Sequence, residues 1–218
     1  MPATNPLPIV YVETNWIAAC VVMHDDHHKA ASTLLQQAMN GECELRVPQA
    51  AVLESRTTVA KVQSRLFKPL EEARNAITKA YRNSVTDVKP IVDAIKTALE
   101  QPGVRDYMTR DVEAERRRLL STPPVAVFSD TQAEFAMMGA LRFDVPFDGK
   151  DINDFYILSA VLGDRDKPEH VIRPAMLFST NDKQFAKLNT TYAQRRIIYR
   201  PDFQLVAGLK DWGQSFPQ

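Results

Sequence analysis

The sequence predicts an α/β fold in which a mostly parallel sheet of about five strands lies between two layers of helices. Five short apolar runs, rich in β-branched and aromatic residues, alternate with segments of helical spacing. This alternation is typical of a parallel sheet, because each parallel strand needs a crossover that a helix usually supplies. At 218 residues the chain can bury the core of such a three-layer α/β/α sandwich. The predicted strands are residues 9–12, 45–47, 125–128, 176–178 and 197–199.

The first strand, residues 9–12, contains only apolar residues and tyrosine, as expected for a strand covered on both faces. Glu13-Thr14-Asn15 follows it at once, and helical spacing begins at Trp16. A second amphipathic helix then leads to Asn40-Gly41, which is a typical helix end. We therefore expect two helices between the first and second strands.

Pro48 stops the second strand and begins a helix. Further along, Pro69 with Glu71 and Glu72 predicts the start of a new helix, because proline and acids are favoured in a first turn. No strand is predicted again before residue 120. We expect a series of helices in this part of the chain.

Two more helices are expected here, over residues 88–99 and 104–119, each followed by prolines. Because the stretch of about residues 63–120 has no alternation of strands and helices, we interpret it as a helical elaboration of one domain, residues 1–218.

The third strand, residues 125–128, is followed by Ser129-Asp130, which is a typical helix start. A further helix over residues 155–162 begins after Asp151 and Asp154. The fourth strand is followed by Ser179-Thr180-Asn181-Asp182, and a helix from Lys183 leads to the last strand. This part of the chain restores the β/α alternation.

Composition limits the classes of function. Lysine plus arginine equal aspartate plus glutamate at 27 each, which argues against attachment to nucleic acid by bulk charge alone. Residues 56–120 nevertheless carry fourteen basic and nine acidic side chains, a net charge of +5. Cys20 and Cys43 form no metal-type pair and suit a reducing compartment. No apolar segment has membrane-spanning length and no signal peptide is recognised, so we expect a soluble cytoplasmic protein without a membrane partner.

Three acids, Glu13, Glu54 and Asp182, follow predicted strands at passages into helices. A parallel sheet brings all such passages to one edge. Asp151 and Asp154 lie three residues apart at a helix start and therefore share a face. Clustered carboxylates repel one another unless a cation neutralises them, and ligands that are all oxygen favour Mg²⁺ or Mn²⁺. The pattern predicts a hard-metal site able to activate water for phosphodiester hydrolysis.

Each acid also has an ordinary structural interpretation. Asp151 and Asp154 can cap a helix, Asp182 can be an N-cap, and Glu54 can be an exposed helical residue. We favour the metal-site interpretation because all of these acids are predicted to lie at the same edge of the sheet.

Four motifs in this order resemble the PIN-domain nucleases over nearly the whole chain. They are Glu13-Thr14-Asn15 after a strand, Glu54 after Pro48, Asp154-Phe155-Tyr156-Ile157 through Ala160, and Thr180-Asn181-Asp182-Lys183-Gln184-Phe185. The resemblance implies a divalent-metal-dependent endonuclease acting on RNA, with Glu13, Glu54, Asp154 and Asp182 as metal ligands. It also implies Asn15 and Thr180 as supporting polar groups. The chain departs from the family in two respects: its first acid is glutamate where aspartate is usual, and its helical stretch is longer than in the compact toxin-like members.

The catalytic residues expected on this basis are Glu13, Glu54, Asp151, Asp154 and Asp182, with Asp151 as a further ligand or a water-orienting group. Lys150 and Lys183 adjoin these acids and are candidates to contact phosphates of the RNA, most simply single-stranded RNA. A second copy of the chain and an antitoxin-like protein are further candidate partners. The alternative is a non-catalytic PIN-like scaffold that binds RNA or a protein through the helical elaboration.

Two other clusters allow two interpretations each. Arg116-Arg117-Arg118 can contact phosphate or form surface salt bridges, and the nearby Glu113 and Glu115 favour salt bridges. The segment from His24 to His28 can hold a metal or cap a helix, and its acids at a helix start favour capping.

Overall fold

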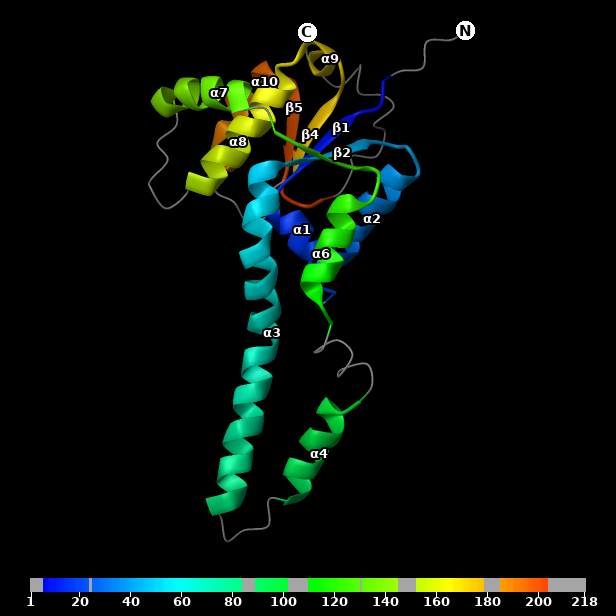
Figure 1. Ribbon diagram of the computed structural model, residues 1–218, viewed down its shortest axis with the longest axis vertical. Coiled ribbons are helices and arrows are strands. Elements are labelled where there is room, and N and C mark those ends of the chain that lie inside the picture. Colours follow the sequence, from blue (N-terminus) through cyan, green and yellow to red (C-terminus); the bar gives the residue numbers. More distant parts are fainter. Residues whose placement is uncertain are drawn as a thin grey trace.

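The predicted α/β/α architecture is confirmed in the structure of the chain, a computed structural model (Figure 1). In its described part, one sheet holds five strands in the order β3-β2-β1-β4-β5, and every neighbouring pair is parallel. The strands are β1 (Ile9–Val12), β2 (Glu44–Pro48), β3 (Val125–Phe128), β4 (Ala175–Phe178) and β5 (Ile197–Arg200). The structure describes residues 6–23, 25–83, 89–101, 110–129, 131–144, 152–178 and 185–203.

The central strand β1 is buried on both faces, as its uninterrupted apolar sequence predicts. It pairs with β2 on one side, where Tyr11 lies opposite Arg46, and with β4 on the other, where Val12 lies opposite Phe178. The four residues of β4 are likewise fully buried. These two strands hold the centre of the hydrophobic core.

Helices cover both faces of the sheet (Figure 1). On one face lie α1 (Thr14–Val21), α2 (His28–Met39) and α6 (Val112–Ser121). On the other lie α7 (Thr131–Asp144) and α8 (Ile152–Arg165). Shorter pieces complete the chain around β4 and β5: α9 (Pro168–Val171), the 3₁₀ helix η1 (Phe185–Leu188) and α10 (Asn189–Gln194). The predicted end of α2 at Asn40-Gly41 is confirmed, since Asn40 is its C-cap and Gly41 has a left-handed φ of 75°.

A long helix, α3 (Gln49–Asn83), extends away from the sheet, and α4 (Lys89–Leu99) returns beside it (Figure 1). The helix start predicted at Pro69 is wrong, because α3 runs through this residue without a break. An exposed proline removes one main-chain hydrogen bond and costs about 3 kcal/mol, which the turns of helix on both sides outweigh.

Within the helix expected over residues 104–119, the described helix is α6, which begins at Val112. Asp111 accepts hydrogen bonds from the main-chain N–H groups of Glu113 and Ala114 and caps α6. Residues 104–109 lie outside the described part of the chain. Between β2 and β3, the described residues form helices, as expected.

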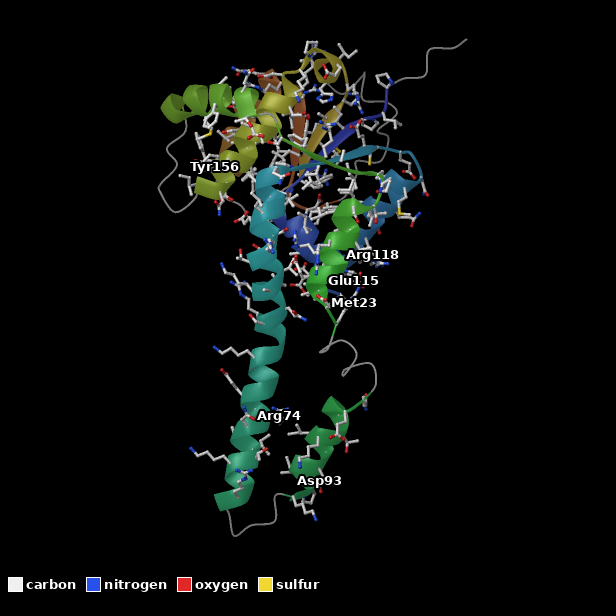
Figure 2. All side chains as sticks on the ribbon, in the orientation of Figure 1. Met23, Arg74, Asp93, Glu115, Arg118 and Tyr156 are labelled. Carbon is white, nitrogen blue, oxygen red and sulfur yellow. The ribbon has the colours of Figure 1, made fainter. Side chains whose placement is uncertain are left out.

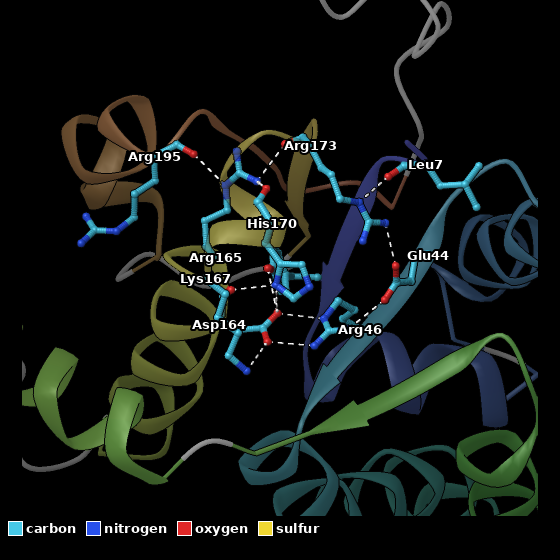
Figure 3. A network of polar contacts seen from close by, with 10 residues as sticks. Leu7, Glu44, Arg46, Asp164, Arg165, Lys167, His170, Arg173 and Arg195 are labelled. Carbon is cyan, nitrogen blue, oxygen red and sulfur yellow. Dashed lines mark hydrogen bonds and ion pairs between the residues drawn. The ribbon is translucent and has the colours of Figure 1, made fainter. Parts of the chain in front are cut away.

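A buried ionic network fixes the end of α8 to the sheet (Figure 3). Asp164, near the end of α8, accepts two hydrogen bonds of 2.8 Å from Arg46 of β2 and one of 3.0 Å from the Tyr11 hydroxyl of β1. Lys167 and His170 also lie within 3.2 Å of its carboxylate. Burial disfavours the charge, but these hydrogen bonds and positive charges outweigh it and hold the pKa of Asp164 below its usual value.

Arg165, the next residue, is 1% exposed and has no carboxylate partner among the contacts of Figure 3. Its guanidinium instead donates to main-chain carbonyls of Arg195, His170, Arg173 and Val171. Because these carbonyls come from the segments before β4 and before β5, the side chain joins α8 to both. The amino edge of the sheet and the end of α8 therefore form one tightly bonded unit.

Candidate functional site

The carboxyl ends of β1 and β4 lie side by side where the direction of the chain connections changes. From β1 the chain passes to β2 on one side, and from β4 it passes to β5 on the other. In open α/β sheets, ligands bind outside the carboxyl ends of the strands at such a switch point. Glu13 follows β1 directly, so the structure places it at this point.

Glu13 has a structural contact as well as this position. Its Oε2 accepts a hydrogen bond of 2.7 Å from the main-chain N–H of Asn15, and it is the N-cap of α1. Only 4% of Glu13 is exposed. A carboxylate at a helix N-terminus accepts hydrogen bonds from the unsatisfied N–H groups there, which fixes the orientation of the Glu13 side chain.

Glu54 lies on the first turns of α3 and is oriented by two side chains from other helices. The Thr14 hydroxyl donates to Oε2 at 2.6 Å, and Asn153 Nδ2 lies 3.5 Å from Oε1. Thr14 is the first residue of α1 and Asn153 belongs to the first turn of α8. Glu54 is half-buried, so the interpretation as a simply exposed residue is not supported.

The starts of three helices therefore meet around Glu54. Asp154 follows Asn153 on the first turn of α8 and is half-buried. Glu13, Glu54 and Asp154 therefore lie at the starts of helices that begin at this edge of the sheet, and Thr14, the residue after Glu13, contacts Glu54. The remaining predicted site residues lie outside the described part of the chain: Lys150, Asp151, Thr180, Asp182 and Lys183.

The chemistry of this donor set suits a hard cation. The acidic side chains at the edge offer only oxygen atoms as ligands. A hydroxyl and an amide contact Glu54 and orient its carboxylate, as hydrogen-bond partners of metal ligands do in metal sites. Within the described ranges, no three histidine, cysteine, aspartate or glutamate side chains lie close enough to hold a metal ion. The described residues fit Mg²⁺ or Mn²⁺ by ligand type but supply only part of a coordination sphere.

Two polar residues at this edge were missed by sequence reasoning. Asn15 was expected as a supporting polar group, and its main-chain N–H contacts Glu13, whereas Thr14 contacts Glu54 with its side chain. Asn153 lies between Asp151 and Asp154, and this position among acids at a helix start could have marked it as a candidate site residue. Its partner on α3 could not be foreseen, because the two residues are 99 positions apart.

Apolar side chains beside these polar groups are exposed. Leu53 precedes Glu54 and is 60% exposed, and Ile152 precedes Asn153 and is 52% exposed. Tyr156 lies one turn further along α8, 41% exposed (Figure 2). Unstacked nucleic-acid bases pack against such apolar and aromatic surfaces.

The arginines of α6 form salt bridges, as expected. Arg116 is 5% exposed and donates to Glu113 at 2.8 Å and to the main-chain carbonyl of Val52 on α3 at 3.1 Å. Arg118 lies 2.7 Å from Glu115. The contact with Val52 fastens α6 to α3, and the burial of Arg116 leaves it no access to a phosphate.

In the described part of the His24–His28 segment, no side chain caps α2, whose N-cap is His27, so the expected capping is not found there. Asp25 accepts a hydrogen bond from the main-chain N–H of His27 at 2.8 Å, and His28 Nδ1 lies 2.7 Å from the Ala19 carbonyl. His24 lies outside the described residues.

The chain matches no protein-family model and no curated protein sequence. Across the described ranges, no helix is both long and apolar enough to cross a membrane.

Proposed function

We propose that the protein is a divalent-metal-dependent endoribonuclease that hydrolyses RNA phosphodiester bonds. The observation that carries this proposal is that two side chains from other helices contact Glu54 near the switch point of the sheet. They are Thr14, which follows β1, and Asn153, at the start of α8. The resemblance of four sequence motifs to PIN-domain nucleases supports the same assignment. The proposed metal ligands are Glu13, Glu54, Asp154 and Asp182, with Asp151 as a further ligand or a water-orienting group.

The side chains at this edge have separate tasks. Bound Mg²⁺ or Mn²⁺ would supply a Lewis acid and lower the pKa of a coordinated water. Thr14 and Asn153 contact the two oxygens of Glu54 and so fix the direction in which its lone pairs point. The main-chain N–H of Asn15 does the same for Glu13. These contacts hold the acids in place before substrate arrives, which reduces the reorganisation needed during reaction.

The expected substrate is single-stranded RNA, whose unpaired bases can contact Leu53, Ile152 and Tyr156 while Lys150 and Lys183 contact phosphates. We propose a cytoplasmic location for this activity. A second copy of the chain and an antitoxin-like protein remain proposed partners.

A second candidate is a non-catalytic scaffold of the same fold that binds RNA or a protein through the α3–α4 arm. One observation favours it: Glu13 is nearly buried and caps α1, which gives this acid a structural role without a metal.

Cleavage of end-labelled single-stranded RNA in Mg²⁺, Mn²⁺ or excess EDTA separates the two candidates. We expect cleavage with either metal and none in EDTA. Glu54→Gln should reduce the rate by at least about 100-fold, because it removes a proposed ligand charge. Glu42→Gln, at an exposed glutamate before β2, is the matched control and should cleave like the parent.

Full activity in EDTA would refute the metal-dependent mechanism. Equal rates for Glu54→Gln and the parent would remove Glu54 from the site. RNA binding without cleavage in either metal would support the scaffold.

A further inference from the structure

A row of positive side chains on α3 begins at the candidate site. Lys61, Arg65, Lys68 and Lys79, here named the α3 basic stripe, follow Glu54 at intervals of seven, four, three and eleven residues. These intervals are close to whole numbers of helical turns. The four cations therefore share the face of α3 that carries Glu54.

The stripe is open to solvent. All four side chains are exposed, and Lys68 retains 75% of its side-chain surface. Arg74, about half a turn out of phase with Glu54, lies on the flank of α3 nearer α4, and nitrogen-tipped side chains project from the opposite flank (Figure 2). Glu72 shares the stripe face but lies 3.9 Å from Lys68, in an exposed pair of small energetic weight.

The length of the stripe decides what it fits. At about 1.5 Å per residue, Lys61 lies roughly 10 Å along the helix from Glu54, Lys68 roughly 21 Å and Lys79 roughly 37 Å. The stripe is longer than any small anion, and its length suits a polymer with one negative charge on every unit. A nucleic-acid backbone is such a polymer. Neighbouring exposed residues such as Thr57 and Asn75 are polar, whereas a protein partner would need apolar or aromatic anchors.

We propose that the α3 basic stripe binds the phosphates of single-stranded RNA on one side of the bond held at Glu54. This inference rests on the proposed function, because it takes Glu54 as part of the cleavage site. RNA of a few nucleotides then contacts only the cleavage site, whereas longer RNA contacts both the cleavage site and the α3 basic stripe. The arm lengthens the binding site without adding chemistry to it.

The test compares two triple variants with the same change of charge. The stripe variant is Lys61→Gln/Arg65→Gln/Lys68→Gln. The control variant, Arg74→Gln/Lys96→Gln/Arg117→Gln, changes exposed cations away from the stripe face. Glutamine is a good helix former, so both variants should retain the helical circular dichroism of the parent.

Binding of a fluorescent oligouridine of about 20 nucleotides is measured by anisotropy in EDTA over a range of salt. Each lost phosphate contact lowers the slope of log K against log salt by about 0.7 for a single strand. The stripe variant should therefore lose roughly two units of slope, and the control variant less than about half a unit. For an oligouridine of about five nucleotides, the parent and the stripe variant should bind equally.

Equal slopes for the stripe variant and the parent on the long oligonucleotide would overturn the proposal. Competition by polyglutamate as effective as by the RNA would also overturn it, because the stripe would then bind acidic chains of any kind. Since binding is measured without metal, its result is independent of cleavage. If the stripe variant loses slope but the parent does not cleave RNA, the α3 basic stripe binds RNA and the nuclease proposal is rejected. If the parent cleaves RNA but the stripe variant has an unchanged slope, the nuclease proposal is supported and the stripe proposal is rejected.

Discussion

Asp164→Asn tests whether the buried network at the amino edge of the sheet stabilises the fold. The variant keeps the size of the side chain but removes the negative charge that faces Arg46, Lys167 and His170. The Asp164 side chain is fully buried and that of Arg46 is 14% exposed. Removal of one partner from such a pair costs about 3–5 kcal/mol, because the other charge stays buried.

We expect the lower end of this range, about 3 kcal/mol, because Glu44 still pairs with Arg46 at 2.8 Å. For a chain of this size that loss lowers the melting temperature by roughly 6–12 °C. Urea unfolding at pH 7, followed by circular dichroism, measures the change. Asp166→Asn is the matched control: Asp166 pairs with Arg195 at 2.9 Å but is 43% exposed, so its loss should cost less than about 1 kcal/mol.

The same pair predicts a pH dependence. The pKa of Asp164 is lower in the folded chain than in the unfolded chain, where it is about 3.9, so the folded state prefers the ionised form. The stability that the charge supplies is present above the unfolded pKa and is lost as the pH falls through the lower folded pKa. The difference between the parent and Asp164→Asn should therefore be constant from about pH 5 to pH 7 and shrink below about pH 4. A cost below about 1 kcal/mol at pH 7, or a difference independent of pH, would refute this account.

Two further predictions concern single residues. Glu13→Ala should abolish RNA cleavage and lower the free energy of unfolding by about 1 kcal/mol, because it removes the N-cap of α1; Glu13→Asp should retain cleavage or alter the preference between Mn²⁺ and Mg²⁺. Parent-like cleavage by Glu13→Ala at saturating metal would show that Glu13 is not a ligand. Pro69→Ala should slow hydrogen exchange of the α3 amides around it, because it restores an N–H that can bond to the Arg65 carbonyl, a change worth up to about 3 kcal/mol. Unchanged exchange there would mean that proline imposes no local weakness on the arm.

The strands could be predicted because each is a short apolar run bounded by turn residues, and the two that are buried on both faces, β1 and β4, are apolar throughout apart from Tyr11. The place of Glu13 was predictable for a related reason: any residue that directly follows a parallel strand lies at the carboxyl edge of the sheet. The position of Glu13 therefore follows from the sequence alone, given the fold class. Which strand lies beside β1 does not follow, because β4 is more than 160 residues away.

The errors and omissions come from interactions that a local pattern does not contain. Pro69 has the local signature of a helix start, but helix formation is cooperative, and the turns on both sides continue through it. Contacts of Glu54 with Thr14 and Asn153 depend on how α1, α3 and α8 pack. Those packing angles are properties of the assembled core and are not encoded in any one segment.

The central position of β1 also has a consequence for synthesis of the chain. One side of β1 pairs with β2, which is made soon afterwards, but the other side waits for β4, about 163 residues later than Val12. At about 5–20 residues per second, a ribosome needs on the order of ten to thirty seconds to supply that partner. Until then β1 is an edge strand with apolar side chains and unpaired main-chain groups, the kind of surface that pairs with other chains. The nascent protein thus passes through a period in which protection of this edge, by a chaperone or by low concentration, governs how much of it reaches the folded state.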